Sequence, residues 1–207
     1  MKIFDISPMV SEQTPVFPGD QPLELRWTAR IGPGCPVNLS ALTLSPHLGA
    51  HADAPVHYAH GAAAIGEVDL EPYWGLCRVV DVRGCGPLVE PYHLAGRLDG
   101  SPSRVLLRTC ESAPTRWSHE FAALAPATIA LLAAAGVRLV GIDSQSVDPA
   151  DSKELPSHQA LLHADMRVLE NLVLDNVAEG DYELVALPLR LAHACASPVR
   201  AALRSLA

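Results

Sequence analysis

The sequence is poor in basic residues, and this limits the partners that its surface suits. It has 15 lysines and arginines against 23 aspartates and glutamates, which gives a formal net charge of −8 over 207 residues. No group of basic residues is dense enough to neutralise a phosphate backbone. We therefore expect a mildly acidic surface and no nucleic-acid partner.

Cysteine is sparse and follows no recognised pattern. The count is odd, and no C-x-x-C spacing occurs among Cys35, Cys77, Cys85, Cys110 and Cys195. Neither a disulfide framework nor a zinc site made of thiolates is indicated. We expect reduced thiols that serve mainly in packing.

Long hydrophobic runs are missing as well. The first residues carry no apolar run typical of a signal peptide, and no segment reaches the ~18 apolar residues that cross a bilayer. We therefore expect a cytoplasmic protein without membrane contact. An apolar share of 49% is enough for one sizeable core and the chain is short for two, so a single domain over residues 1–207 is predicted.

The first half contains short apolar runs separated by proline and glycine, which is typical of strands. Residues 3–6 and 23–27 predict half-buried strands, and the run 37–44 predicts a strand that leads to a histidine-rich segment. Runs of leucine and β-branched residues predict buried strands at 76–82 and 104–107.

The second half adds helices to this pattern. Residues 126–135 predict a helix, because Pro126 stands near its start, alanine and leucine fill its body and Gly136 follows. A strand is predicted directly after it, at 137–143, and this alternation favours an α/β fold. The remaining predicted segments are a short helix at 156–164, an apolar run at 168–174, and closing strands at 182–189 and 199–203.

Four polar side chains within eleven residues carry the strongest functional signal: His47, His51, Asp53 and His57. All four have the same parity, so an extended chain would project them to one side, whereas a helix would scatter them. Imidazole nitrogens and a carboxylate oxygen suit borderline divalent metals, and a fourth group can move protons during hydrolysis. We therefore predict a metal site here rather than a set of unrelated surface histidines.

Two histidines and one aspartate leave a metal shell incomplete, so further ligands must come from elsewhere. Glu170 lies inside the apolar run 168–174, where an ionised carboxylate is costly to bury without a cation. Strand alternation places it outward, as an exposed residue, about as readily as inward. His158 and His163 fall on the predicted helix 156–164, and each by itself is more typical of a surface histidine.

The string His47-Leu-Gly-Ala-His51-Ala-Asp53-Ala-Pro55-Val-His57-Tyr58 resembles the signature of the metal-dependent cyclase-like hydrolases. The likeness is greatest to the bacterial kynurenine formamidase branch of that family. Matching segments run along nearly the whole chain, at 15–20, 141–144, 180–184, 186–190 and 196–200. The resemblance implies an α/β, cyclase-like swivelling β/α/β fold, in which a mixed sheet is packed with helices.

The resemblance also implies a set of metal ligands. The positions matching His47, His51 and Asp53 bind one zinc in that family, and the position matching His158 binds a second. Those matching Asp53 and Glu170 bridge the two ions. Two Zn²⁺ per subunit are therefore expected, and the same ligand types also accept Mn²⁺. Relatives in the family are commonly homodimers, which is the assembly expected here.

Two further roles come from the same comparison with the family. His57 matches the residue that transfers a proton, and Phe17 matches a loop aromatic that contacts substrate. Phe17 opens a Phe-Pro-Gly-Asp turn, and it stands where relatives often have Trp, so the ring is kept and the indole N–H is lost. Ala50 stands where many relatives outside the formamidase branch carry Thr, which supports the assignment to that branch.

The resemblance implies hydrolysis of N-formyl-L-kynurenine to L-kynurenine and formate, an amide cleavage in tryptophan degradation. Water activated by metal would attack the formyl group, and His57 would protonate the departing aromatic amine. Two alternatives stay open. The first is a related metal hydrolase of another amide or of a cyclic amide such as isatin. The second is a metal-binding protein without catalysis, against which the presence of His57 weighs.

Overall fold

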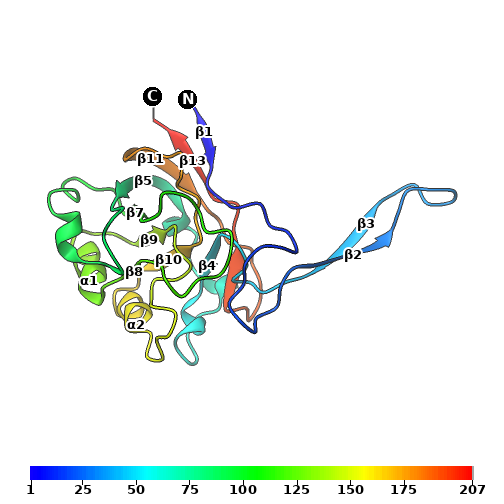
Figure 1. Ribbon diagram of the computed structural model, residues 1–207, viewed down its shortest axis with the longest axis horizontal. Helices are drawn as coiled ribbons and strands as arrows, with labels where there is room; N and C mark the ends of the chain where they lie inside the picture. The colour runs from blue at the N-terminus through cyan, green and yellow to red at the C-terminus, as the bar shows by residue number, and fades with distance from the viewer. Residues whose placement is uncertain (207) are drawn as a thin grey trace.

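A computed structural model describes residues 1–206, and a large mixed sheet runs through it (Figure 1). Four neighbouring strands at the centre of this sheet are parallel, and the strands on either side are antiparallel. Its nine strands, in spatial order, are β1 (Ile3–Asp5), β13 (Ala202–Ser205), β11 (Gly180–Val185), β5 (Trp74–Asp81), β7 (Arg104–Arg108), β9 (Leu139–Ile142), β10 (Arg167–Glu170), β4 (His51–Asp53) and β12 (Ala196–Pro198).

The parallel strands are buried because helices and loops cover them. All four residues of β9 are buried, as are Val105, Leu106 and Leu107 of β7, which explains the apolar sequences of these two strands. On one face they pack against α1 (Pro126–Ala134) and α2 (Pro156–His163), through residues such as Ile129 and Leu161. Both helices lie within one residue of their predicted bounds.

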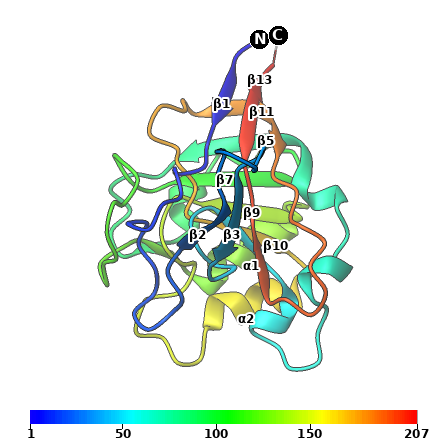
Figure 2. The ribbon, with the colours of Figure 1, turned by 90° about the vertical axis from the view of Figure 1, so that its right-hand side faces the viewer.

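The other face of the sheet packs against the sheet's own outer strands. Leu106 and Leu169 from the parallel strands share one buried cluster with Leu184 of β11 and Ala52 of β4. The sheet is therefore curled, and the mixed α/β architecture expected from the sequence is confirmed. β1 and β13 lie side by side at one edge of the sheet, as Figure 2 shows.

A hairpin of two strands, β2 (Glu24–Ala29) and β3 (Leu39–Thr43), projects from the body of the molecule (Figure 1). Every residue of β3, and every residue of β2 except Ala29, is exposed. The prediction that residues 23–27 form a half-buried strand is therefore wrong about burial. Their alternation is real, but neither face of the hairpin meets a core within the chain.

The C-terminal strands also differ from the prediction. The segment 199–203 is not one strand, because the chain leaves β12 at Pro198 and enters β13 at Ala202. These two strands pair at opposite ends of the sheet, so three residues cross between them. The other short elements are η1 (Pro55–His57), η2 (Ile65–Glu67), η3 (Glu71–Tyr73), β6 (Leu88–Val89), η4 (Pro91–Leu94) and β8 (Ala123–Leu124).

The helices of residues 1–206 are short. Among them, none combines the length and the hydropathy that a membrane span needs.

Candidate metal centre

The motif of residues 47–57 is brought together by three different local structures. His51 and Asp53 are the ends of β4, where alternation does point them to one side. His47 lies in the preceding turn, and His57 ends the short helix η1. The extended-chain argument therefore holds for two residues and is wrong for the other two. The turn itself needs Gly49, whose φ of 67° is readily adopted only without a side chain.

Strand register places Glu170 beside this motif. β10 runs antiparallel to β4, with Glu170 directly opposite His51, so the two side chains share a face. Glu170 Oε2 lies 3.3 Å from His51 Nε2, and the residue is only 4% exposed. Its Oε1 accepts a hydrogen bond of 2.8 Å from the backbone N–H of Val147. Of the two orientations that the sequence left open, Glu170 adopts the inward one.

His158 reaches the same cluster from α2. Its Nε2 lies 3.3 Å from Asp53 Oδ2 and 3.7 Å from Glu170 Oε1, and the residue is 2% exposed. Its spacing alone favoured a surface histidine, and that interpretation is wrong. The interpretation as a surface histidine is correct for His163, which is exposed at the end of the same helix.

Asp148 lies behind His158 and was not predicted from the sequence. Its carboxylate accepts a 2.7 Å hydrogen bond from His158 Nδ1 and further bonds from the backbone N–H groups of Ser157 and His158. Nδ1 of His158 therefore donates to Asp148, and Nε2 is left facing Asp53. A carboxylate behind a ligating imidazole is the usual arrangement in metal sites. No spacing rule connects Asp148 to His158, so the sequence contains no signal for it.

The other two imidazoles also point at Asp53. His51 donates from Nδ1 to the carbonyl oxygen of Gly49 at 2.9 Å, which leaves its Nε2 facing Asp53 Oδ1 at 3.4 Å. His47 Nδ1 lies 3.0 Å from the same oxygen. Three histidines from two segments of the chain thus converge on one carboxylate.

The electrostatics of the cluster are those of a cation site. Asp53 is 1% exposed, and although two imidazole nitrogens lie within 3.4 Å of its Oδ1, neither they nor any other donor of residues 1–206 is oriented to hydrogen-bond to this oxygen. Burial acts to raise the pKa of Asp53, but the imidazoles of His158, His47 and His51 outweigh it and hold that pKa well below its usual range. Nitrogen and carboxylate donors with buried negative charge suit a divalent ion such as Zn²⁺ or Mn²⁺.

The two deepest histidines respond in the same way. Burial acts to lower the pKa of His51 and His158, but the neighbouring carboxylates outweigh it and raise both values to about 10. For His51 these carboxylates are Asp53 and Glu170, and for His158 Asp148 comes first. The cluster therefore attracts positive charge, which bound protons or metal ions can supply.

A cavity of about 320 Å³ opens beside the cluster. His57 lines it, with its ring centroid 4.3 Å from that of His47. Burial is the main cause that lowers the pKa of His57 below its ordinary value, which favours the neutral imidazole. Phe17 and Trp117 form another part of the wall. Their rings meet edge to face, with 5.1 Å between the ring centroids.

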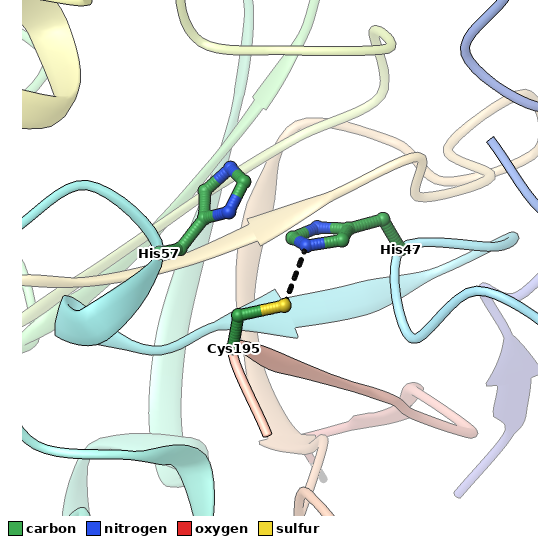
Figure 3. Close-up of side chains that lie close together, drawn as sticks. All are labelled: His47, His57 and Cys195. Atoms are coloured by element: carbon green, nitrogen blue, oxygen red, sulfur yellow. Dashed lines mark hydrogen bonds between the residues drawn. The ribbon is translucent and has the colours of Figure 1, made fainter. Parts of the chain in front are cut away.

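Cys195 also reaches this region, as Figure 3 shows. Its Sγ lies 3.3 Å from His47 Nε2, and ligand atoms of His47, His57 and Cys195 lie within 4.8 Å of one another. Nothing in the spacing indicates this contact, because 148 positions separate Cys195 from His47.

Comparisons with known proteins give relatives in both sequence and structure. A family model described as putative cyclase matches residues 4–149. A kynurenine formamidase of Delftia acidovorans is 60% identical over 206 residues, which cover 100% of this chain and 99% of that protein. A solved structure titled as a potential metal-dependent hydrolase with cyclase activity has a TM-score of 0.84 at 28% identity, and the match covers 98% of this chain and 96% of that one.

A more distant structure shares the fold alone. An isatin hydrolase bound to the product analogue thioisatinate has a TM-score of 0.80 at 18% identity, with 98% of this chain and 91% of that one covered. The cyclase-like fold and the hydrolase class expected from the motif are both confirmed. The family model spans more than half of the chain, and the identity extends over its full length. The chain therefore belongs to the cyclase family, in the branch of the kynurenine formamidases.

Proposed function

We propose that this protein hydrolyses N-formyl-L-kynurenine to L-kynurenine and formate, as a step in tryptophan degradation. The observation that carries the proposal is the buried cluster in which imidazoles from the segment 47–51 and from α2 meet the carboxylates of Asp53 on β4 and Glu170 on β10, beside a cavity of ligand size. The 60% identity to a protein named as a kynurenine formamidase supports this substrate.

The cluster would hold two zinc ions, with manganese as an alternative. His47 and His51 would bind one ion and His158 the other, with Asp53 and Glu170 between the two. These residues fit the ions, because Asp53 Oδ1 is buried without a hydrogen-bond partner in residues 1–206 and the Nε2 atoms of His51 and His158 face carboxylates, where a cation can take the place of their protons. When bound, the ions supply Lewis acidity, which lowers the pKa of water and stabilises negative charge on the formyl oxygen.

His57 would move the proton that amide cleavage requires. Its imidazole borders the cavity, and burial lowers its pKa, which favours the neutral form that can accept a proton from the attacking water. It then returns that proton to the nitrogen that leaves the formyl carbon, because an arylamide anion is a poor leaving group. Phe17, 53% exposed at the cavity wall, would stack on the aromatic ring of the substrate.

We further propose a homodimer that works in the cytoplasm. The β2–β3 hairpin exposes Leu25, Trp27, Leu39 and Leu42 away from any core of the chain, and exposed large apolar side chains gathered on one element are typical of protein interfaces. The five cysteines are free, which fits a reducing compartment.

Release of formate tests the substrate assignment. The protein is stripped with a chelator, reloaded with Zn²⁺ or Mn²⁺, and offered N-formyl-L-kynurenine, formanilide and isatin in parallel. We expect rapid formate release from N-formyl-L-kynurenine after reloading and none before it. Ring opening of isatin without turnover of the formamides would favour the cyclic-amide alternative. Metal uptake without turnover of any of the three would favour a binding protein.

A further inference from the structure

Beyond the metal cluster, the cavity is lined by one acidic and one basic side chain. These are Asp20, in the loop before β2, and Lys153, in the loop before α2. Neither forms an ion pair with any of residues 1–206 that the structure describes. Arginine is absent from the lining, so Lys153 supplies the permanent positive charge of this wall.

Asp20 is held at the cavity by the same turn that presents Phe17. The backbone N–H of Asp20 donates to the carbonyl oxygen of Phe17 at 2.9 Å, which closes a turn across Pro18 and Gly19. Gly19 has a φ of 93°, as the third position of a type II turn requires. Asp20 Oδ1 accepts the N–H of Gln21 at 2.8 Å, which orients the carboxylate.

Phe17 and Asp20 therefore stand at the two ends of one rigid turn. An aromatic contact and a negative charge are offered at a fixed spacing, and Lys153 adds a positive charge from another loop. An aromatic amino acid carries the matching groups, namely an aryl ring, an ammonium and a carboxylate. Opposite charges at a partly enclosed site attract more strongly than in open water.

We propose that Asp20 and Lys153 form the subsite for the amino-acid end of the substrate. Lys153 pairs with the α-carboxylate and Asp20 with the α-ammonium, while the formamide lies toward the metal cluster. This inference rests on the proposed formamidase activity and goes beyond it, since neither residue belongs to the ligand motif. It also explains why formanilide and isatin, which lack both charges, should be poorer substrates.

Two substrates and three variants test the subsite. N-formyl-L-kynurenine is compared with N-(2-acetylphenyl)formamide, which has the same formamide and aryl ketone but no amino-acid group. The variants are Lys153→Met, Asp20→Asn and the control Lys2→Met. Lys2 is the other lysine of the chain, and it lies over the ring of Phe4, away from the cavity lining. Asparagine at position 20 keeps an oxygen for the N–H of Gln21.

We expect Lys153→Met to raise the KM for N-formyl-L-kynurenine on the order of tenfold to a hundredfold, the usual range for a lost charge-assisted hydrogen bond. The kcat should change little, because the contact is equally strong in the ground state and the transition state. Asp20→Asn should act in the same direction. Both variants should leave kcat/KM for N-(2-acetylphenyl)formamide within about twofold of the original value.

Calorimetric titration of the metal-loaded protein with L-kynurenine provides a readout without turnover. Lys153→Met should weaken this binding by the same factor, with metal content unchanged. Equal losses on both substrates, an unchanged affinity for L-kynurenine, or the same effect from Lys2→Met would overturn the proposal. If the unmodified protein binds L-kynurenine through Lys153 but hydrolyses neither formamide, the subsite stands and the proposed reaction fails.

Discussion

Two β-structures lie close together in the sequence and differ in almost every physical respect. β4 is buried at all three residues and pairs on both sides, with β10 and with β12. The β2–β3 hairpin, which ends eight positions earlier, is exposed on both faces and pairs only with itself. A two-stranded hairpin in water is marginally stable on its own.

This difference assigns two roles to different parts of the chain, the metal cluster to β4 and assembly to the hairpin. β4 is fixed by its neighbours, so the side chains of His51 and Asp53 are held in a precise arrangement with Glu170 and His158. The hairpin lacks such neighbours, and its exposed leucines and tryptophan favour a partner outside the chain. We therefore expect substitutions in β4 to abolish chemistry and substitutions in the hairpin to alter assembly.

The largest effect is expected from Asp53→Ala, because three imidazoles converge on this carboxylate. The variant should lose bound metal, measured by elemental analysis, and formate release should fall by at least about a thousandfold. Asp151→Ala, which removes an exposed acid from the loop before α2, serves as the control. Retention of both metal and activity in Asp53→Ala would remove Asp53 from the centre of the site.

His57→Ala should separate metal binding from catalysis. The imidazole borders the cavity without contacting Asp53 in an ion pair, so the metal content should stay at the level of the unmodified protein. The kcat should fall about a hundredfold to ten-thousandfold, the range for a lost acid–base group. Metal loss equal to that of Asp53→Ala would instead make His57 a ligand.

A smaller effect is expected from Asp148→Asn, which acts through His158. The amide that replaces the carboxylate binds the imidazole Nδ1–H less strongly, so the orientation and basicity of His158 change. Metal affinity should fall about tenfold to a hundredfold, in proportion to activity. Excess metal in the assay should restore most of the activity, whereas damage to the fold would not respond to metal.

Asp148 also marks where prediction from the sequence ends. The helix 126–135 and the buried strand 104–107 follow from periodicity and local chemistry, and the structure places them as expected. The motif of residues 47–57 follows from its residue types, but only His51 and Asp53 lie on a strand as its parity predicts. The partners of the motif do not follow, because Glu170 and His158 reach it only through strand pairing and helix packing. The family resemblance implies Glu170 and His158 as ligands. Neither the local sequence pattern nor the resemblance indicates Asp148 or Lys153.

For the hairpin, the sequence predicts the strand but not its burial. Residues 23–27 alternate as a half-buried strand does, and the strand forms, but periodicity cannot say whether the buried face meets this chain or another one. The same pattern is therefore consistent with a core strand and with an interface strand. Burial had to be observed in the folded chain.

The smallest effect on chemistry is expected from a charge placed on the hairpin. Leu42→Glu introduces a carboxylate on β3, where Leu42 is 58% exposed and pairs with Leu25 of β2. Light scattering should show the mass shift from dimer to monomer, because burying an unpaired charge at an interface is costly. Metal content should stay unchanged, and the thermal stability of the isolated subunit should change little, since exposed substitutions usually alter the free energy of unfolding by under about 0.5 kcal/mol.

Glu24→Leu provides the matched control at the base of the same hairpin, since it removes a charge instead of adding one. A dimer that survives Leu42→Glu would place the interface elsewhere and leave the hairpin without an assigned partner. A monomer that retains full kcat would show that each subunit carries a complete site. A monomer that loses kcat while keeping its metal would show that the β2–β3 hairpin also supports the cavity. Assembly and chemistry would then not be divided between the hairpin and β4.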